Sequence, residues 1–140
     1  MEFINCTFNA DSKPEYSMWC YSKDASFKNC TFNGYGKWIN VYCENNSEAY
    51  NISFEGCRFV NLGAKNKAAV NVKDFGSAQI KYNVFIKNCT VSGAFPEKGE
   101  GNTAKLNVLS PLVQVDDITG KDGFITVTLD DVMVFDNRAK

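Results

Sequence analysis

Histidine is absent from the 140 residues, and arginine occurs only twice, at Arg58 and Arg138. Without histidine, the Ser–His and Cys–His pairs that activate a nucleophile are excluded. The 15 basic and 16 acidic residues nearly balance, and no Lys/Arg run indicates a nucleic-acid partner. No apolar run approaches the roughly 20 residues of a membrane-spanning helix. The chain, 1–140, therefore has the length of a single domain. Its sequence does not indicate a Ser–His or Cys–His nucleophile, a nucleic-acid partner or a membrane-spanning helix.

A short motif recurs five times along the chain. Its clearest copy is FKNCTFN at residues 27–33, and further copies start at Phe3, Phe54 and Ile86, with a degenerate fifth copy at Leu129. The cysteine position, taken by Val132 in the fifth copy, recurs after 24, 27, 32 and 43 residues (6 to 30, 30 to 57, 57 to 89, 89 to 132). A fixed feature at this interval, with loops of variable length, is typical of a repeat protein.

Each copy of this corner motif predicts a strand, a sharp corner and a second strand. Apolar residues alternate before the corner, as at Ala25 and Phe27, which indicates a strand with one buried face. Two bend residues then reset the alternation, so that Phe27, Cys30 and Phe32 all lie on the inner side. The second bend residue tolerates a left-handed backbone in every copy: Asn5, Asn29, Gly56, Asn88 and Asp131. Stacked copies would form inner ladders of Cys6, Cys30, Cys57 and Cys89 and of Phe8, Phe32 and Phe59.

The motif F-x-N-C-x-F, with a third strand in each repeat, resembles the right-handed parallel β-helix of the pectate-lyase-like superfamily over nearly the whole chain. The resemblance implies an all-β fold, a right-handed single-stranded parallel β-helix (solenoid) of about four to five coils. That superfamily includes polysaccharide lyases, glycoside hydrolases, esterases, epimerases, viral tail-spike proteins and non-catalytic surface proteins. The shared fold therefore does not choose among these functions.

The two ends of the sequence were inspected for the caps that close a β-helix. A β-helix usually needs a cap at each end, because an open coil is an exposed sheet edge. Neither end shows an amphipathic helix to serve as a cap, and no signal peptide opens the chain. We therefore expect a fragment or domain of a longer protein, with any secretion signal outside these residues.

The six cysteines are interpreted as buried free thiols. Four occupy the inner corner position, where a small apolar residue fits, and Cys20 and Cys43 are expected to face inward from third strands. Neighbouring ladder cysteines could approach disulfide distance, although parallel side-chain directions disfavour the bond. With no C-x-x-C motif and no histidine, no metal site and no cofactor are predicted.

The outward face of the third strands is the predicted ligand-binding surface. It combines aromatic residues of the first two repeats with polar residues, namely Trp19, Tyr21, Trp38, Asn40, Tyr42, Asn71 and Lys73. Exposed aromatic rings are good platforms for the C–H faces of sugars, and in the resembling enzymes this kind of sheet forms the saccharide groove. In the third repeat, Val70 and Val72 are expected inward, and Ala69, Asn71 and Lys73 outward. The alternative is that the aromatic residues pack among themselves or beneath a neighbouring domain.

No catalytic residues are predicted in this chain. Asp116–Asp117 is similar to the Asp-Asp pair of polygalacturonase-like hydrolases, but adjacent strand residues point to opposite faces and a solvated turn explains the pair. The Gly-His-Gly motif of those hydrolases is absent. Lyases of this fold use an Arg or Lys base beside acidic calcium ligands, and the sequence shows no acidic cluster near Lys73.

The leading functional hypothesis is a non-catalytic extracellular or cell-surface β-helix module that binds polysaccharide or serves as a rigid spacer. One alternative is a fragment of a carbohydrate-active enzyme, a polysaccharide lyase or glycoside hydrolase, whose catalytic residues lie outside this chain. A second alternative is a viral or prophage adhesion protein, which would usually be a trimer. The ligand and the oligomeric state stay open at this point.

Overall fold

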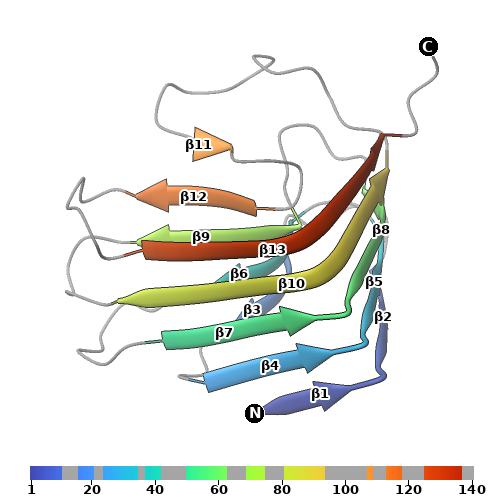
Figure 1. The fold of residues 1–140 in the computed structure, drawn as a ribbon, viewed down its shortest axis with the longest axis horizontal. Coiled ribbons are helices and arrows are strands. Elements are labelled where there is room, and N and C mark those ends of the chain that lie inside the picture. The colour runs from blue at the N-terminus through green and yellow to red at the C-terminus, as the bar shows by residue number, and fades with distance from the viewer. Residues whose placement is uncertain are drawn as a thin grey trace.

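The computed structural model describes residues 1–10, 16–20, 24–34, 37–41, 50–62, 69–74, 81–93, 107–108, 113–117 and 125–136. These residues contain thirteen β-strands and no helix. The strands form one eight-stranded and one five-stranded sheet (Figure 1). The prediction of an all-β fold with a parallel sheet is therefore confirmed.

All strand pairs of the larger sheet are parallel. Its order is β1 (Glu2–Ile4), β4 (Asp24–Lys28), β7 (Tyr50–Glu55), β10 (Tyr82–Gly93), β8 (Arg58–Leu62), β5 (Thr31–Asn33) and β2 (Thr7–Asn9), and β13 (Ile125–Asp136) pairs with β10. The long, bent β10 pairs through its first half with β7 and through its second half with β8 (Figure 1). Each strand thus pairs with the strand that occupies the same place in the next copy of the motif.

In the smaller sheet, β9 and β12 run in the opposite direction to β7, β10 and β13 (Figure 1). Its order is β11 (Asn107–Val108), β12 (Val113–Asp117), β9 (Val70–Asp74), β6 (Lys37–Val41) and β3 (Tyr16–Cys20). The pairs from β3 to β12 are parallel, whereas β11 lies antiparallel to β12. The sequence did not predict β11, because Asn107 and Val108 stand outside the corner motif.

All five predicted corner residues adopt a left-handed backbone. The φ angles are 56° at Asn5, 51° at Asn29, 64° at Gly56, 51° at Asn88 and 53° at Asp131. In the first three copies the corner separates two strands, whereas β10 and β13 continue through it. The prediction of a reset at the corner is confirmed, because the apolar residues on both sides of it reach one core.

The core contains two columns of stacked phenylalanine rings. Ring centroids are 5.1 and 5.0 Å apart along Phe3–Phe27–Phe54, and 5.1 and 4.8 Å apart along Phe8–Phe32–Phe59. The columns meet edge to face, for example at 5.6 Å between Phe27 and Phe32. Such aromatic pairs each add about 0.5–1.5 kcal/mol beyond the burial of their area. The predicted phenylalanine ladder is therefore confirmed.

Both sheets contribute to this core. The smaller sheet supplies the fully buried side chains of Ile39, Val41, Val70, Val72 and Val113, which belong to the same cluster as the phenylalanines. The inward direction predicted for Val70 and Val72 agrees with their place in this cluster. Tyr50 and Tyr82 are also buried, with ring centroids 5.8 Å apart, and the motif gave no signal for them.

Candidate functional site

The predicted binding surface lies on the smaller sheet, where strand register sets the spacing of its residues. One row across β3, β6, β9 and β12 contains Trp19, Asn40, Asn71 and Gln114. Trp38 lies two residues before Asn40 in β6, so the two tryptophans occupy neighbouring rather than directly opposite positions. Tyr21, Tyr42 and Cys43 lie outside the described residues. The use of this surface for binding stays a prediction.

The exposure predicted for Asn71 is wrong. Asn71 and Ala69 are fully buried, as are Val70 and Val72 on the other face of the strand. Alternation separates the two faces of a strand, but it does not say whether the second face reaches solvent. Here β9 lies between β6 and β12 and is buried on both faces. Because Asn71 is buried, we no longer propose that it contacts a ligand directly.

Strand pairing places an acidic residue opposite Lys73, although no acidic cluster near Lys73 was predicted from the sequence. The register of β9 with β12 places Asp116 opposite Lys73 and Asp117 opposite Asp74. The signal was available in the sequence, because Lys73-Asp74 and Asp116-Asp117 each follow a V-x-V segment. These positions bring three acidic residues and one lysine to the same end of two paired strands.

Rows of hydrogen-bonded amides run across the outer surface of the larger sheet. The Asn51 amide donates to Asp24 Oδ1 at 3.1 Å, and the Asn83 amide donates to Asn51 Oδ1 at 3.1 Å. Across β2, β5 and β8 the Asn33 amide donates to Asn9 Oδ1 at 3.1 Å, and the Asn61 amide donates to Asn33 Oδ1 at 2.6 Å. Asn51 and Asn33, in the middle of the two rows, each donate to one repeat and accept from the next, so the rows favour the observed register of successive repeats.

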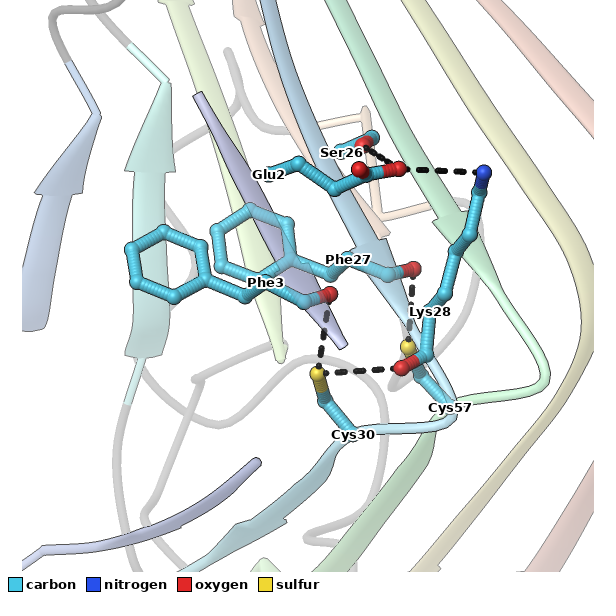
Figure 2. Close-up of polar contacts among 7 residues, drawn as sticks. All are labelled: Glu2, Phe3, Ser26, Phe27, Lys28, Cys30 and Cys57. Atoms are coloured by element: carbon cyan, nitrogen blue, oxygen red, sulfur yellow. Dashed lines mark hydrogen bonds and ion pairs between the residues drawn. The ribbon is translucent and has the colours of Figure 1, made fainter. Parts of the chain in front are cut away.

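A shallow groove of about 310 Å³ lies beside the first of these rows. Its polar lining comes from Glu2, Asp24, Ser26, Asn51 and Ser53. Figure 2 shows the Glu2 carboxylate accepting from the Ser26 hydroxyl at 3.4 Å and pairing with Lys28 Nζ at 3.1 Å. The Lys28 ammonium lowers the pKa of Glu2 below its ordinary value by hydrogen bonding and charge. The groove therefore presents an ionised carboxylate among hydroxyl and amide groups.

Phe85 is an exposed aromatic residue on the same outer surface. It stands in register with Ser53 on one side and Thr128 on the other, and it is 46% exposed. Asn83, two residues earlier in β10, belongs to the amide row that reaches the groove. Phe85 was not predicted as a site residue from the sequence. The equivalent positions of the earlier repeats are polar, namely Glu2, Ser26 and Ser53, so a phenylalanine at this position could have been noticed.

The corner thiols have a backbone-capping geometry. Cys57 Sγ contacts the Phe27 carbonyl at 3.3 Å, and Cys30 Sγ contacts the Phe3 and Lys28 carbonyls at 3.5 and 3.3 Å (Figure 2). Cys57 Sγ also contacts the Glu55 carbonyl at 3.6 Å. Cys6, Cys30, Cys57 and Cys89 are free, as predicted. The Cys89 thiol and burial raise the pKa of Cys57, and burial raises that of Cys30. Both thiols are therefore neutral near pH 7 and suited to structure rather than to nucleophilic attack.

The chain matches no protein-family model, no curated protein and no solved structure. Within the part of the chain that the structure describes, no group of three or more Cys, Asp or Glu side chains could hold a metal ion. In the same part, no helix is long and apolar enough to cross a membrane.

Proposed function

We propose that this chain is a right-handed parallel β-helix module, extracellular or on a cell surface, that binds polysaccharide and is not itself catalytic. Three parallel strand series support the β-helix, because each series advances by one copy of the motif at every step: β1–β4–β7–β10–β13, β2–β5–β8 and β3–β6–β9–β12. Five copies with up to three strands each correspond to four to five coils.

The observation that carries the binding proposal is the exposed Phe85 ring beside continuous rows of hydroxyl and amide groups. An exposed ring offers a flat apolar face to a sugar ring. Ser53 and Thr128 flank it in register, and Asn83 leads into the amide row. These groups donate and accept hydrogen bonds, as sugar hydroxyls require. We therefore place the ligand across β7, β10 and β13, with a neutral polysaccharide as its class.

Affinity electrophoresis in gels containing neutral polysaccharides tests this proposal. We expect the wild-type chain to be retarded by at least one polysaccharide and Phe85→Ala to migrate freely, with little change in thermal midpoint because the ring is half exposed. Thr7→Ala, at an exposed position of β2 away from these three strands, should remain retarded. Salt should change the retardation little, because stacking and neutral hydrogen bonds carry the binding.

A parallel measurement on Trp38→Ala separates the two candidate surfaces. Loss of retardation in Trp38→Ala alone would move the binding site to the smaller sheet and refute the Phe85 assignment. Absence of retardation in the wild-type chain would leave only the spacer function. Release of new reducing ends or of unsaturated sugars from any of the polysaccharides would refute the non-catalytic part of the proposal.

A further inference from the structure

Asn33 and Gly34 form a dipeptide with a chemical reactivity of its own. They are the one Asn-Gly pair in the sequence. In such a pair the asparagine amide can be lost through attack by the following backbone nitrogen, and glycine has no Cβ to hinder the approach. Asn33 is the last residue of β5 and is partly exposed, and Gly34 follows it with a φ of 144°. The chemistry of this pair therefore depends on how the fold holds it.

The reaction makes two demands on the pair. The Gly34 nitrogen must give up its proton to water or hydroxide and reach Cγ of Asn33, and the Nδ2 group must leave as ammonia, which closes a cyclic imide. Water then adds at either carbonyl carbon of the imide and opens the ring, giving aspartate or isoaspartate. The net change converts amide and water into acid and ammonia, with water as the co-reactant. Both the nucleophilic N–H and the leaving amide must therefore be free to move.

In the folded chain both groups are held by hydrogen bonds. The N–H of Gly34, which is buried, donates to the Val60 carbonyl at 3.1 Å, so the proton that the reaction removes is already engaged. The Asn33 amide donates to Asn9 Oδ1 at 3.1 Å, and its own Oδ1 accepts from the Asn61 amide at 2.6 Å. Attack at Cγ therefore requires that these bonds open first.

The other amide row offers an internal comparison. Asn51 donates to Asp24 and accepts from Asn83, both at 3.1 Å, as Asn33 does with its own neighbours. Asn51 is followed by Ile52, however, and a buried β-branched residue hinders attack by its own backbone nitrogen. The same hydrogen-bond arrangement thus occurs once with a reactive dipeptide and once without it.

We propose that Asn33 is a spontaneous deamidation site, which the amide row of β2, β5 and β8 protects in the folded chain and local opening of these strands exposes. The aspartate product can remain in the row, because its carboxylate accepts from Asn61 and from a reoriented Asn9 amide. The isoaspartate product adds an atom to the main chain before Gly34 and so displaces the N–H that is bonded to Val60. Isoaspartate is therefore a covalent mark of chains that have opened here. This inference goes beyond the proposed function and does not depend on polysaccharide binding.

Peptide mapping by mass spectrometry, after incubation at mildly alkaline pH, tests the proposal. In the denatured chain we expect Asn33 to be converted faster than any other asparagine. In the folded chain it should be converted at least about tenfold more slowly, because three hydrogen bonds must open first.

Two variants release Asn33 without denaturant. Asn9→Val removes the acceptor of its amide, and Asn61→Gly removes the donor to its Oδ1 while glycine keeps the positive φ of 58° at that position. Each should raise the rate at Asn33 in the folded chain about two- to tenfold, the effect of one lost hydrogen bond. Circular dichroism shows whether each variant folds, and either one alone suffices if the other does not.

Controls and contrary outcomes complete the test. Asn83→Thr removes an amide from the other row and should leave the rate at Asn33 unchanged. Equal rates at Asn33 in the folded and denatured chains, or folded Asn9→Val and Asn61→Gly variants that react like the wild-type chain, overturn the protective role of the row. Conversion of Asn33 in the denatured chain no faster than that of Asn51 overturns the site itself. Asn33→Asp should be nearly as stable as wild type, and a marked loss would overturn the distinction between the two products.

Discussion

At the scale of single residues, the corner motif explains why asparagine and cysteine recur together. The corner residue turns the backbone through a left-handed conformation, and its N–H donates to the next repeat. The turn leaves the carbonyl of the residue two positions earlier, such as Phe27, directed toward the next repeat, where it accepts a hydrogen bond from the Cys57 thiol. A valine at the cysteine position, as at Val132, would pack similarly but could not donate.

Backbone conformation, rather than side-chain contact, should dominate the energetics of the corner. We expect Asn29→Val to lower the free energy of unfolding by roughly 1–3 kcal/mol, because a β-branched residue is strained at positive φ. Asn29→Gly should be nearly neutral, since glycine adopts this conformation freely. Chemical denaturation measures both, with Thr31→Val in the adjacent regular strand as the control. Equal losses for valine and glycine would show that the asparagine side chain matters instead.

The raised pKa of Cys57 makes a prediction about alkaline stability. In the unfolded chain this thiol ionises near its ordinary pKa of 9.0, whereas in the folded chain the Cys89 thiol and burial hold it neutral to higher pH. The folded state therefore binds more protons above pH 9, and stability falls as pH rises. The Cys57 thiol lowers the pKa of Cys89, which opposes this effect, so the loss of stability is expected to be smaller than that of one whole proton per molecule.

A matched variant isolates this contribution from other groups that titrate at high pH. Cys57→Val keeps an apolar side chain of the type found at Val132 and removes the thiol. Under reducing conditions, we expect its unfolding free energy to be lower than that of wild type near pH 7 but to fall less steeply between pH 8 and 10. Identical pH slopes in the two proteins would show that Cys57 does not titrate differently on folding.

At the scale of elements, the corner motif was sufficient to predict the strands, the corners and the register of the larger sheet. Because the pattern occurs five times, an inward position assigned wrongly in one copy would have disagreed with the other four. The motif makes no prediction for residues outside its copies. The motif did not predict strand β11. It also did not predict the positive φ of 58° at Asn61, which lies beside a register shift between β8 and β10. Both features occur at positions that the motif does not cover.

The candidate site was less predictable than the fold for the same reason. Alternation assigned Trp19, Trp38 and Asn40 to third strands that do pair in register, but it could not show that Asn71 is buried. Phe85 was overlooked because it sits at an outward position where hydroxyl groups are the rule. The repeat identifies the residues that stacking requires. A binding residue, by contrast, differs from the repeat, and it can be recognised only when its neighbours on the adjacent strands are known.

At the scale of the whole molecule, stability should vary along the stack rather than be uniform. In the described strands, pairing follows the order of the repeats, so the central strands β4, β7 and β10 have neighbours on both sides while β1 and β13 have one. In such arrangements, stability is approximately a sum of repeat and nearest-neighbour contributions. Local opening is therefore expected to start at the ends and to reach the centre last.

Amide hydrogen exchange gives this expectation a direct measurement. We predict that amides in β4 and β7 exchange most slowly and that those in β1, β2 and β13 exchange fastest in dilute solution. The buried aromatic columns stabilise the centre, where Phe27 and Phe54 are at most 1% exposed, while Phe3 in β1 is only partly buried. Uniform exchange in all strands would instead indicate a single cooperative unit without end fraying.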